Sequence, residues 1–322
     1  MSAALDWVST FLYAAILAGV PLLFGTLGEI LTEKAGNVNL GVEGMMYMGA
    51  VFGFMGGYYL DSVPLVLLLA FLGGMAGAAV YAFLTVTLKA NQNVTGLTLT
   101  IFGTGLATML GTNMINASST GAAICSDAVK QAFRPMNLGF LTQIPYLGKV
   151  LFNHSPFTYM AIALALAAGW YLNHTSRGLN LRAVGENPAA ADAAGINVSL
   201  YKYVHILLGG GICGLGGAYI VMVTCGGSWT YECVGGLGWI AVALVIFAVW
   251  SPYQAILGSL VFGALSVLRL YIPASVVEIP AAFYSMVPFA ATCVILVISS
   301  IRQSREKQQP RACGVNYFRE ER

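Results

Sequence analysis

The side chains that could do chemistry in this sequence gather in the stretch GTLGEILTEKAGNVNLGVEGMMYMGA, residues 25–50. Glu29 and Glu33 are one helical turn apart and share a helix face, where Lys34 can approach one of them. Glu43 follows, and long apolar runs flank the group on both sides. Ionisable groups at membrane depth are costly unless they are paired or face water. This composition is typical of a polar pathway through a membrane.

Glycine and asparagine interrupt the helical pattern of the same stretch. Gly36, Gly41 and Gly44 weaken a helix around the two asparagines, and a broken helix frees backbone groups to line a cavity. We therefore predict a broken or re-entrant helix beside a translocation pathway. The residues predicted for that pathway are Asn37, Asn39, Gly41, Glu43 and Gly44.

A simpler interpretation of this stretch remains open. Residues 32–41 would then form a cytoplasmic turn between two membrane spans, and Glu43 would be solvated at a helix start. Broken-helix sites are the less common outcome of the two.

The sequence contains no catalytic constellation. Its 3 histidines are dispersed, and it lacks the HExxH spacing, the nucleophile elbow and the GxxxxGK[ST] phosphate loop. The 6 cysteines form neither a CxxC pair nor a Cys/His metal spacing. A Cys225–Cys233 disulfide on the outer side is conceivable, although small apolar residues near helix ends are the preferred interpretation. We expect a chain that is not an enzyme and holds no metal or cofactor.

Composition places the chain in a membrane. Of 322 residues, 58% are hydrophobic and only 9% are charged, against about a quarter in a soluble domain. The pattern predicts an all-α polytopic bundle of about nine transmembrane helices, with eight to ten allowed. The expected spans are 10–31, 42–60, 64–88, 94–115, 156–173, 199–223, 236–250, 253–272 and 280–301.

Lysine and arginine set the predicted orientation. Most of the 15 basic residues fall on the side of segment 174–198, which the positive-inside rule makes cytoplasmic. The net charge of +2 reflects this bias, and we expect membrane lipid around the bundle and no nucleic-acid partner. The domain prediction is a transmembrane part, 1–301, followed by a cytoplasmic tail, 302–322, that is solvated and partly disordered.

Two loops are longer than the others. The outer one, 116–155, either gates a pathway and receives a partner or is only a folded connection. The second, 174–198, contains a helix start at Asn187–Pro188 and a left-handed stop at Gly195, which predicts a helix of about two turns over 188–194.

The predicted short helix has an almost entirely alanine surface. An ordinary helix lying on the bilayer is the alternative, but such an anchor needs Trp, Phe or Leu on one face and basic residues on the other. Residues 188–194 have neither. A smooth surface of small residues favours docking into a groove of another protein.

Two motifs together resemble a known family. NVNLGVEGMMYMGA and RGLNLRAVGENPAAADAAGINVSLYKYV resemble the permease subunits of bacterial ABC importers of the ribose, branched-chain amino acid and nucleoside group. The resemblance covers roughly residues 10–300. The form NLGVEGMM, where sugar permeases tend to carry Asp-Leu-Ser-Val-Gly, is most similar to the nucleoside or simple-sugar permeases.

The resemblance implies a set of partners in the bacterial inner membrane. These are a cytoplasmic ABC ATPase that binds ATP and Mg, a second permease subunit that makes a homo- or heterodimer, and an external substrate-binding protein. Segment 174–198 becomes the coupling loop. The residues expected to couple to the ATPase are Arg182, Gly185, Glu186, Asn187, Pro188, Asp192 and Gly195.

Three other functions compete with a nucleoside or simple-sugar importer. An ion-gradient-driven secondary transporter would use Glu29, Glu33 and Glu43 as coupling carboxylates. A branched-chain amino acid importer would need partners for both charges of its substrate. A structural membrane scaffold would explain the abundant glycine, but not a capped helix in a cytoplasmic loop.

Overall fold

The computed structural model describes residues 2–136, 139–271 and 309–318, and part of the stretch 283–297. The expected span 280–301 lies mostly outside the described residues, as do tail residues 302–308 and 319–322. The described chain is helical, and its β-type pairing is one isolated bridge between Ile124 and Ser228. The prediction of an all-α protein is confirmed.

Helices occupy every expected span before residue 272. The bounds are α1 Ser2–Lys34, α2 Val42–Tyr58, α3 Val63–Ala82, η1 Phe83–Thr87, α4 Gln92–Ala117, α5 Asp127–Ala132, η2 Gly139–Gln143, α6 Leu147–Phe152, α7 Pro156–His174, α8 Ser176–Glu186, α9 Pro188–Ala193, α10 Val198–Tyr219, η3 Ile220–Thr224, α11 Leu237–Phe247 and α12 Pro252–Tyr271.

Within the described residues, five helical segments are long and apolar enough to cross a membrane. They are Leu5–Lys34, Val63–Thr87, Gln92–Ala117, Val198–Thr224 and Pro252–Tyr271. The 17 residues of α2 and the 11 of α11 are shorter than the roughly 20 residues that a full span needs. The chain is a multi-pass membrane protein that combines long helices with shorter ones.

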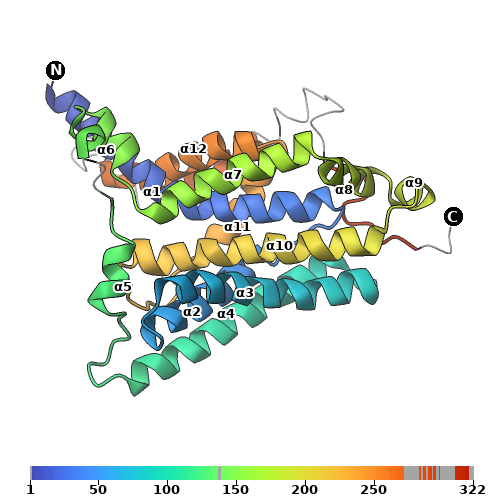
Figure 1. Ribbon diagram of the computed structural model, residues 1–322, viewed down its shortest axis with the longest axis horizontal. Helices are drawn as coiled ribbons and strands as arrows, with labels where there is room; N and C mark the ends of the chain where they lie inside the picture. The colour runs from blue at the N-terminus through green and yellow to red at the C-terminus, as the bar shows by residue number, and fades with distance from the viewer. Residues whose placement is uncertain are drawn as a thin grey trace.

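Helix α10 lies at the centre of the bundle. It runs between α1 on one side and α2 and α3 on the other, with α7 and α12 beyond α1 and α4 beyond α2 (Figure 1). Its glycines allow backbones to meet: a Cβ on Gly74 of α3 would lie 2.8 Å from the backbone nitrogen of Gly214. Small residues at such crossings pack helices tightly in lipid.

The two ends of the bundle differ in structure. Helices α8 and α9 and the C-terminal segment share one end, whereas the N-terminus, α5 and α6 share the other (Figure 1). At the second end, the loop 116–155 packs on the segment between η3 and α11: Cys125 N donates to the Gly227 carbonyl at 2.8 Å, and Trp229 N to the Ala123 carbonyl at 2.9 Å. The described part of this loop is thus folded onto the bundle.

Candidate functional site

The loop between α1 and α2 lies inside the bundle. Helix α1 ends at Lys34 and α2 begins at Val42, and both asparagines between them are 1% exposed. Glu43, in the first turn of α2, is 5% exposed. Burial thus contradicts the solvated Glu43 of the alternative interpretation, and the loop 35–41 is a buried, non-helical connection between α1 and α2.

Side chains of the motif itself fold this loop. The backbone nitrogen of Asn39 donates to Oε1 of Glu29 at 2.8 Å, and the Asn39 side-chain oxygen accepts from the nitrogen of Gly41 at 2.9 Å. A buried backbone group needs such a partner because an unmade hydrogen bond is expensive. The side chains of Glu29 and Asn39 therefore stabilise the loop by accepting hydrogen bonds from its backbone amides.

Polar residues of α3 and α4 also form hydrogen bonds with the backbone of the loop 35–41. The Tyr81 hydroxyl donates to the Val38 carbonyl at 2.5 Å, and Val38 N donates to Oε1 of Gln92 at 2.8 Å. The Thr100 hydroxyl donates to the Leu40 carbonyl at 3.0 Å. Sequence reasoning missed these three supporting side chains, whose only sign was a polar residue in an apolar helix.

Two buried side chains at the loop are incompletely satisfied. The polar atoms of the Asn37 amide and Oε2 of Glu29 make no hydrogen bond of regular geometry among the described residues. The Asn37 amide nevertheless lies next to the Tyr81 hydroxyl, and the Glu29 carboxyl lies next to that of Glu33. Buried polar groups normally bind protein or ordered water. Asn37 is thus a member of the predicted pathway set that keeps hydrogen-bonding capacity.

Glu43 binds the N-terminus of α11. Its Oε1 accepts from the nitrogen of Gly236 at 2.8 Å, and its Oε2 from that of Gly238 at 2.6 Å. Gly236 is the N-cap of α11, with a left-handed φ of 88°. The first amides of a helix lack partners within it, and its N-terminus carries partial positive charge. A carboxylate satisfies both needs.

The short α11 explains why such a cap is required inside the bundle. Eleven residues span about 16 Å, roughly half of a bilayer core. The N-cap Gly236 is half-buried and Gly238 is buried, so water has little access to the first amides of the helix. The remaining predicted member of the pathway set, Gly44, packs against α4, where a Cβ would lie 2.8 Å from the Cα of Thr100.

Glu33 and Lys34 lie at the end of α1. Oε2 of Glu33 accepts from the indole nitrogen of Trp250, in the turn after α11. Lys34 lies near enough to Glu33 for electrostatic attraction, as the sequence suggested, but among the described residues it forms no salt bridge with Glu29 or Glu33.

The predicted short helix is present as α9. Oδ1 of Asn187 accepts from the nitrogen of Ala190 at 3.0 Å, and Gly195 has a φ of +85°. The helix ends at Ala193, one residue earlier than expected. Its buried contact is Ala191, which packs with Val184 and Val198, and small residues occupy its exposed face.

The structure places Gly185 of the coupling set against the end of α1 and the start of the loop 35–41. A Cβ on Gly185 would lie on the Lys34 carbonyl oxygen, and one on Gly36 would lie 3.4 Å from the Gly185 Cα. The remaining members of the coupling set differ in exposure: Arg182 is half-buried and its Nε has no partner in the described chain, whereas Glu186 is exposed. The end of α8 thus rests directly on the start of the loop 35–41.

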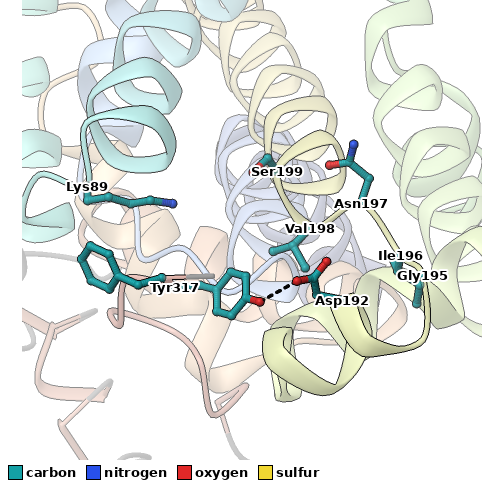
Figure 2. Close-up of a pocket in the computed structure, with 9 residues that line it drawn as sticks. Lys89, Asp192, Gly195, Ile196, Asn197, Val198, Ser199 and Tyr317 are labelled. Atoms are coloured by element: carbon teal, nitrogen blue, oxygen red, sulfur yellow. Dashed lines mark hydrogen bonds between the residues drawn. The ribbon is translucent and has the colours of Figure 1, made fainter. Parts of the chain in front are cut away.

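Part of the C-terminal tail belongs to the same end of the molecule. Residues 309–318, here called the tail segment, pack on the bundle: Ala312 is buried, and its nitrogen donates to the Gly185 carbonyl at 2.9 Å. The Tyr317 hydroxyl donates to Oδ2 of Asp192 at 2.8 Å (Figure 2). The prediction of a solvated tail is wrong for these residues, because several polar and small side chains find partners.

A pocket of about 420 Å³ opens beside the tail segment. Its walls come from the tail segment, Lys89, the end of α9 and the start of α10 (Figure 2). The Tyr317–Asp192 hydrogen bond forms one edge. Sequence reasoning did not find this pocket, because its walls come from three distant parts of the chain.

The conceivable outer disulfide is not formed. Cys225 and Cys233 are free, and the Cys225 thiol lies 3.3 Å from the Thr230 hydroxyl. The described residues also contain no group of three or more His, Cys, Asp or Glu side chains that could hold a metal ion.

Comparison with known proteins assigns the family. Residues 11–296 match the family model described as branched-chain amino acid transport system / permease component. The chain belongs to this permease family. The match covers both the loop 35–41 and the segment 174–198.

Similar permeases are known in archaea and bacteria. A Haloferax volcanii protein provisionally named glucose ABC transporter permease TsgC13 is 36% identical over 271 residues, covering 83% of this permease and 78% of the relative. The nucleoside ABC transporter permease NupC of Lactococcus lactis is 33% identical over 94% of this permease and 95% of the relative. The guanosine ABC transporter permease NupQ of Bacillus subtilis is 31% identical over 98% of both chains.

A solved structure shares the fold. An ABC transporter of metal-chelate type, in an inward-facing conformation, has a TM-score of 0.50 and 15% identity, and the match covers 89% of this permease and 86% of that chain. At this identity the likeness concerns the fold alone.

Proposed function

We propose that this permease forms half of the membrane channel of an ATP-driven importer and carries a nucleoside or a simple sugar. The observation that carries the proposal is the family match together with the capped, exposed α9 at one end of the bundle. The names of the relatives, which refer to nucleosides, guanosine and glucose, support this substrate class.

The ATPase would dock at the end that carries α9. A helix of six residues is too short to be stable alone, so α9 depends on its caps and on its packing against α8 and α10. Held in this way, it offers small side chains to a groove of the ATPase and can move as a rigid lever. This end would face the cytoplasm, because Lys34, Lys89 and Arg177 lie there.

A neutral, hydroxyl-rich solute suits the predicted pathway. The Asn37 amide carries one acceptor and two donors and is incompletely satisfied by the protein, whereas the carboxylates beside it accept hydrogen bonds from backbone or indole groups. Asn39, Gly41 and Gly44 would shape the pathway wall, and Glu43 would hold α11 at its edge.

The same contacts argue against a secondary transporter. Glu29, Glu33 and Glu43 each accept a hydrogen bond that supports the fold, so protonating them would disturb the structure. A branched-chain amino acid needs a partner for each of its two charges, and the residues of the loop 35–41 are all uncharged. Both alternatives fit the site less well than an uncharged solute.

The rest of the assembly follows from this orientation. The permease would cross the bacterial cytoplasmic membrane about nine times over residues 1–301, with its N-terminus outside and residues 302–322 in the cytoplasm. A second permease subunit, identical or not, would complete the channel. The substrate-binding protein would dock at the end that carries α5 and α6 (Figure 1).

Transport in proteoliposomes tests the function. The permease is purified with its associated subunits, reconstituted with the binding protein, and given radiolabelled guanosine with ATP inside the vesicles. We expect ATP-dependent uptake that unlabelled nucleosides compete with and leucine does not. Uptake driven by an ion gradient without ATP, or competition by leucine alone, would contradict the proposal.

A further inference from the structure

The tail segment 309–318 is bound to three different parts of the permease. Cys313 donates its thiol hydrogen to the Glu33 carbonyl at 3.0 Å, and the Ala312 nitrogen is bonded to Gly185. Pro310 is buried beside Gly185. These contacts anchor the segment where the end of α1 meets the end of α8.

Beyond the anchor, the segment reaches the coupling helix. The hydroxyl of Tyr317 is bonded to Asp192 of α9 (Figure 2). Its side chain packs on the apolar cluster formed by Val184, Ala191 and Val198. The tail segment therefore holds α9 through both a polar and an apolar contact.

The preceding residue reaches the opposite side. Nδ2 of Asn316 donates to the Lys89 carbonyl at 2.6 Å, and Oδ1 of Asn316 accepts from Nε2 of Gln92 at 3.3 Å. Oε1 of Gln92 in turn accepts from the nitrogen of Val38 at 2.8 Å. One glutamine thus joins the tail segment to the buried loop 35–41.

A continuous path results, from Asp192 of α9 through Tyr317 and Asn316 to Gln92 and Val38. Helix α9 also packs against the flanking helices α8 and α10, and α10 in turn contacts η1 before the α3–α4 turn. The tail segment adds a hydrogen-bonded link between the proposed lever and the proposed pathway.

We propose that the tail segment is a positioning element for coupling. It fixes α9 relative to the α3–α4 turn and transmits its displacement to the loop 35–41, with Tyr317 and Asn316 as the positioning residues. This inference rests on the proposed coupling role of α9. It predicts that an intact tail segment determines how much ATP is hydrolysed for each solute moved.

A double-mutant cycle tests the path. Tyr317→Phe removes the hydroxyl that binds Asp192 and keeps the ring, and Gln92→Met removes both amide contacts at similar size. Each variant is reconstituted in the full transporter, and ATP hydrolysed per guanosine transported is measured. We expect each single change to raise this ratio about threefold or more, as for the loss of one hydrogen bond. Because both residues lie on one path, the ratio in the double variant should rise by much less than the product of the two single increases.

Matched controls separate coupling from folding and from assembly. Tyr231→Phe removes an exposed tyrosine hydroxyl in the segment between η3 and α11, and it should leave the ratio unchanged. Asn316→Ala provides a second cycle with Tyr317→Phe in case Gln92→Met assembles poorly. The amount of ATPase that co-purifies is measured for every variant.

The outcomes are distinct. The positioning role would be overturned by an unchanged ratio of ATP hydrolysed to guanosine transported in Tyr317→Phe. It would also be overturned if the increases caused by Tyr317→Phe and Gln92→Met multiply in the double variant. Neither result would contradict the proposed importer function. If no ATPase accompanies the unaltered permease, the proposed function itself has failed.

Discussion

Oε2 of Glu43 accepts a 2.6 Å hydrogen bond from the backbone nitrogen of Gly238. This contact joins the first turn of α2 to the first turn of α11, two helices almost 200 residues apart in the chain. A half-length helix can begin inside a membrane protein only if its orphan amides are satisfied there. Glu43 of the NLGVEGMM motif therefore stabilises the N-terminus of α11.

Replacing the carboxylate tests this link. In Glu43→Gln, one oxygen remains to accept, and the charge that complements the α11 N-terminus is lost, which should destabilise the fold by about 1–2 kcal/mol. Uptake should fall while the ATPase still co-purifies. Thermal melting of the detergent-solubilised protein and transport measure the two effects, with the exposed Glu232→Gln as the control. Unchanged melting and uptake would show that the cap is dispensable.

The left-handed residue after α9 should be sensitive to side-chain shape. At a φ of +85°, a β-branched residue is strained by roughly 1–2 kcal/mol, so Gly195→Val should displace the end of the helix. We expect ATP hydrolysis that is poorly coupled to uptake. Gly105→Val, at an α4 glycine with open space around it, is the control. Normal coupling in Gly195→Val would remove the lever hypothesis.

The contact between α8 and α1 leaves no room for a methyl group. A Cβ in Gly185→Ala would lie on the Lys34 carbonyl oxygen, and the same glycine holds Ala312 of the tail segment. Overpacking of this kind costs about 1–3 kcal/mol. A lower melting temperature than that of Gly105→Ala is expected in detergent. Equal melting temperatures for the two variants would mean that this end of the bundle is looser than described.

The thiol of Cys313 reports whether the tail segment is docked. Burial raises the pKa of this thiol above its ordinary value, and the nearby carboxyl groups of Glu33 and Glu29 raise it further. Only the thiolate reacts readily, so alkylation by iodoacetamide should stay slow through pH 9 in a variant whose other cysteines are replaced. Mass spectrometry measures the rate.

The sign of the pH effect follows from linkage. The pKa is higher in the docked state than in the free state, so docking is favoured below the ordinary thiol pKa of about 8.5 and weakens as pH rises above it. Deleting residues 314–322 should expose the thiol and speed the reaction at pH 8. Equal rates for the full and the shortened chain would contradict docking of the tail segment.

Local signals in the sequence were sufficient for the helices and for α9. Apolar runs predicted the spans before residue 272, and Asn187, Pro188 and Gly195 predicted a short helix to within one residue, because caps and stops act on neighbouring residues. The broken helix around Asn39 was predicted from its glycines for the same reason.

Contacts between distant residues could not be predicted. The polar groups of Tyr81 and Gln92 are ordinary polar residues until the fold brings them to Val38. The partner of Glu43 lies in α11, and composition made residues 309–318 resemble a solvated tail although they pack on α8 and α9. Pairing of this kind depends on the tertiary arrangement, which composition and period do not specify.

The central claim is that α9 docks an ATPase, and affinity purification tests it most directly. The tagged permease is extracted from its native membrane in mild detergent, and the co-purifying proteins are identified by mass spectrometry and assayed for ATP hydrolysis. Ala190→Trp places a bulky ring on the exposed face of α9, and Ala117→Trp, at the exposed end of α4, is the control.

We expect an ABC ATPase with the unaltered permease and with Ala117→Trp, and its loss with Ala190→Trp. An unaltered permease that purifies without an ATPase, or an ATPase that is retained equally by both variants, would contradict the account.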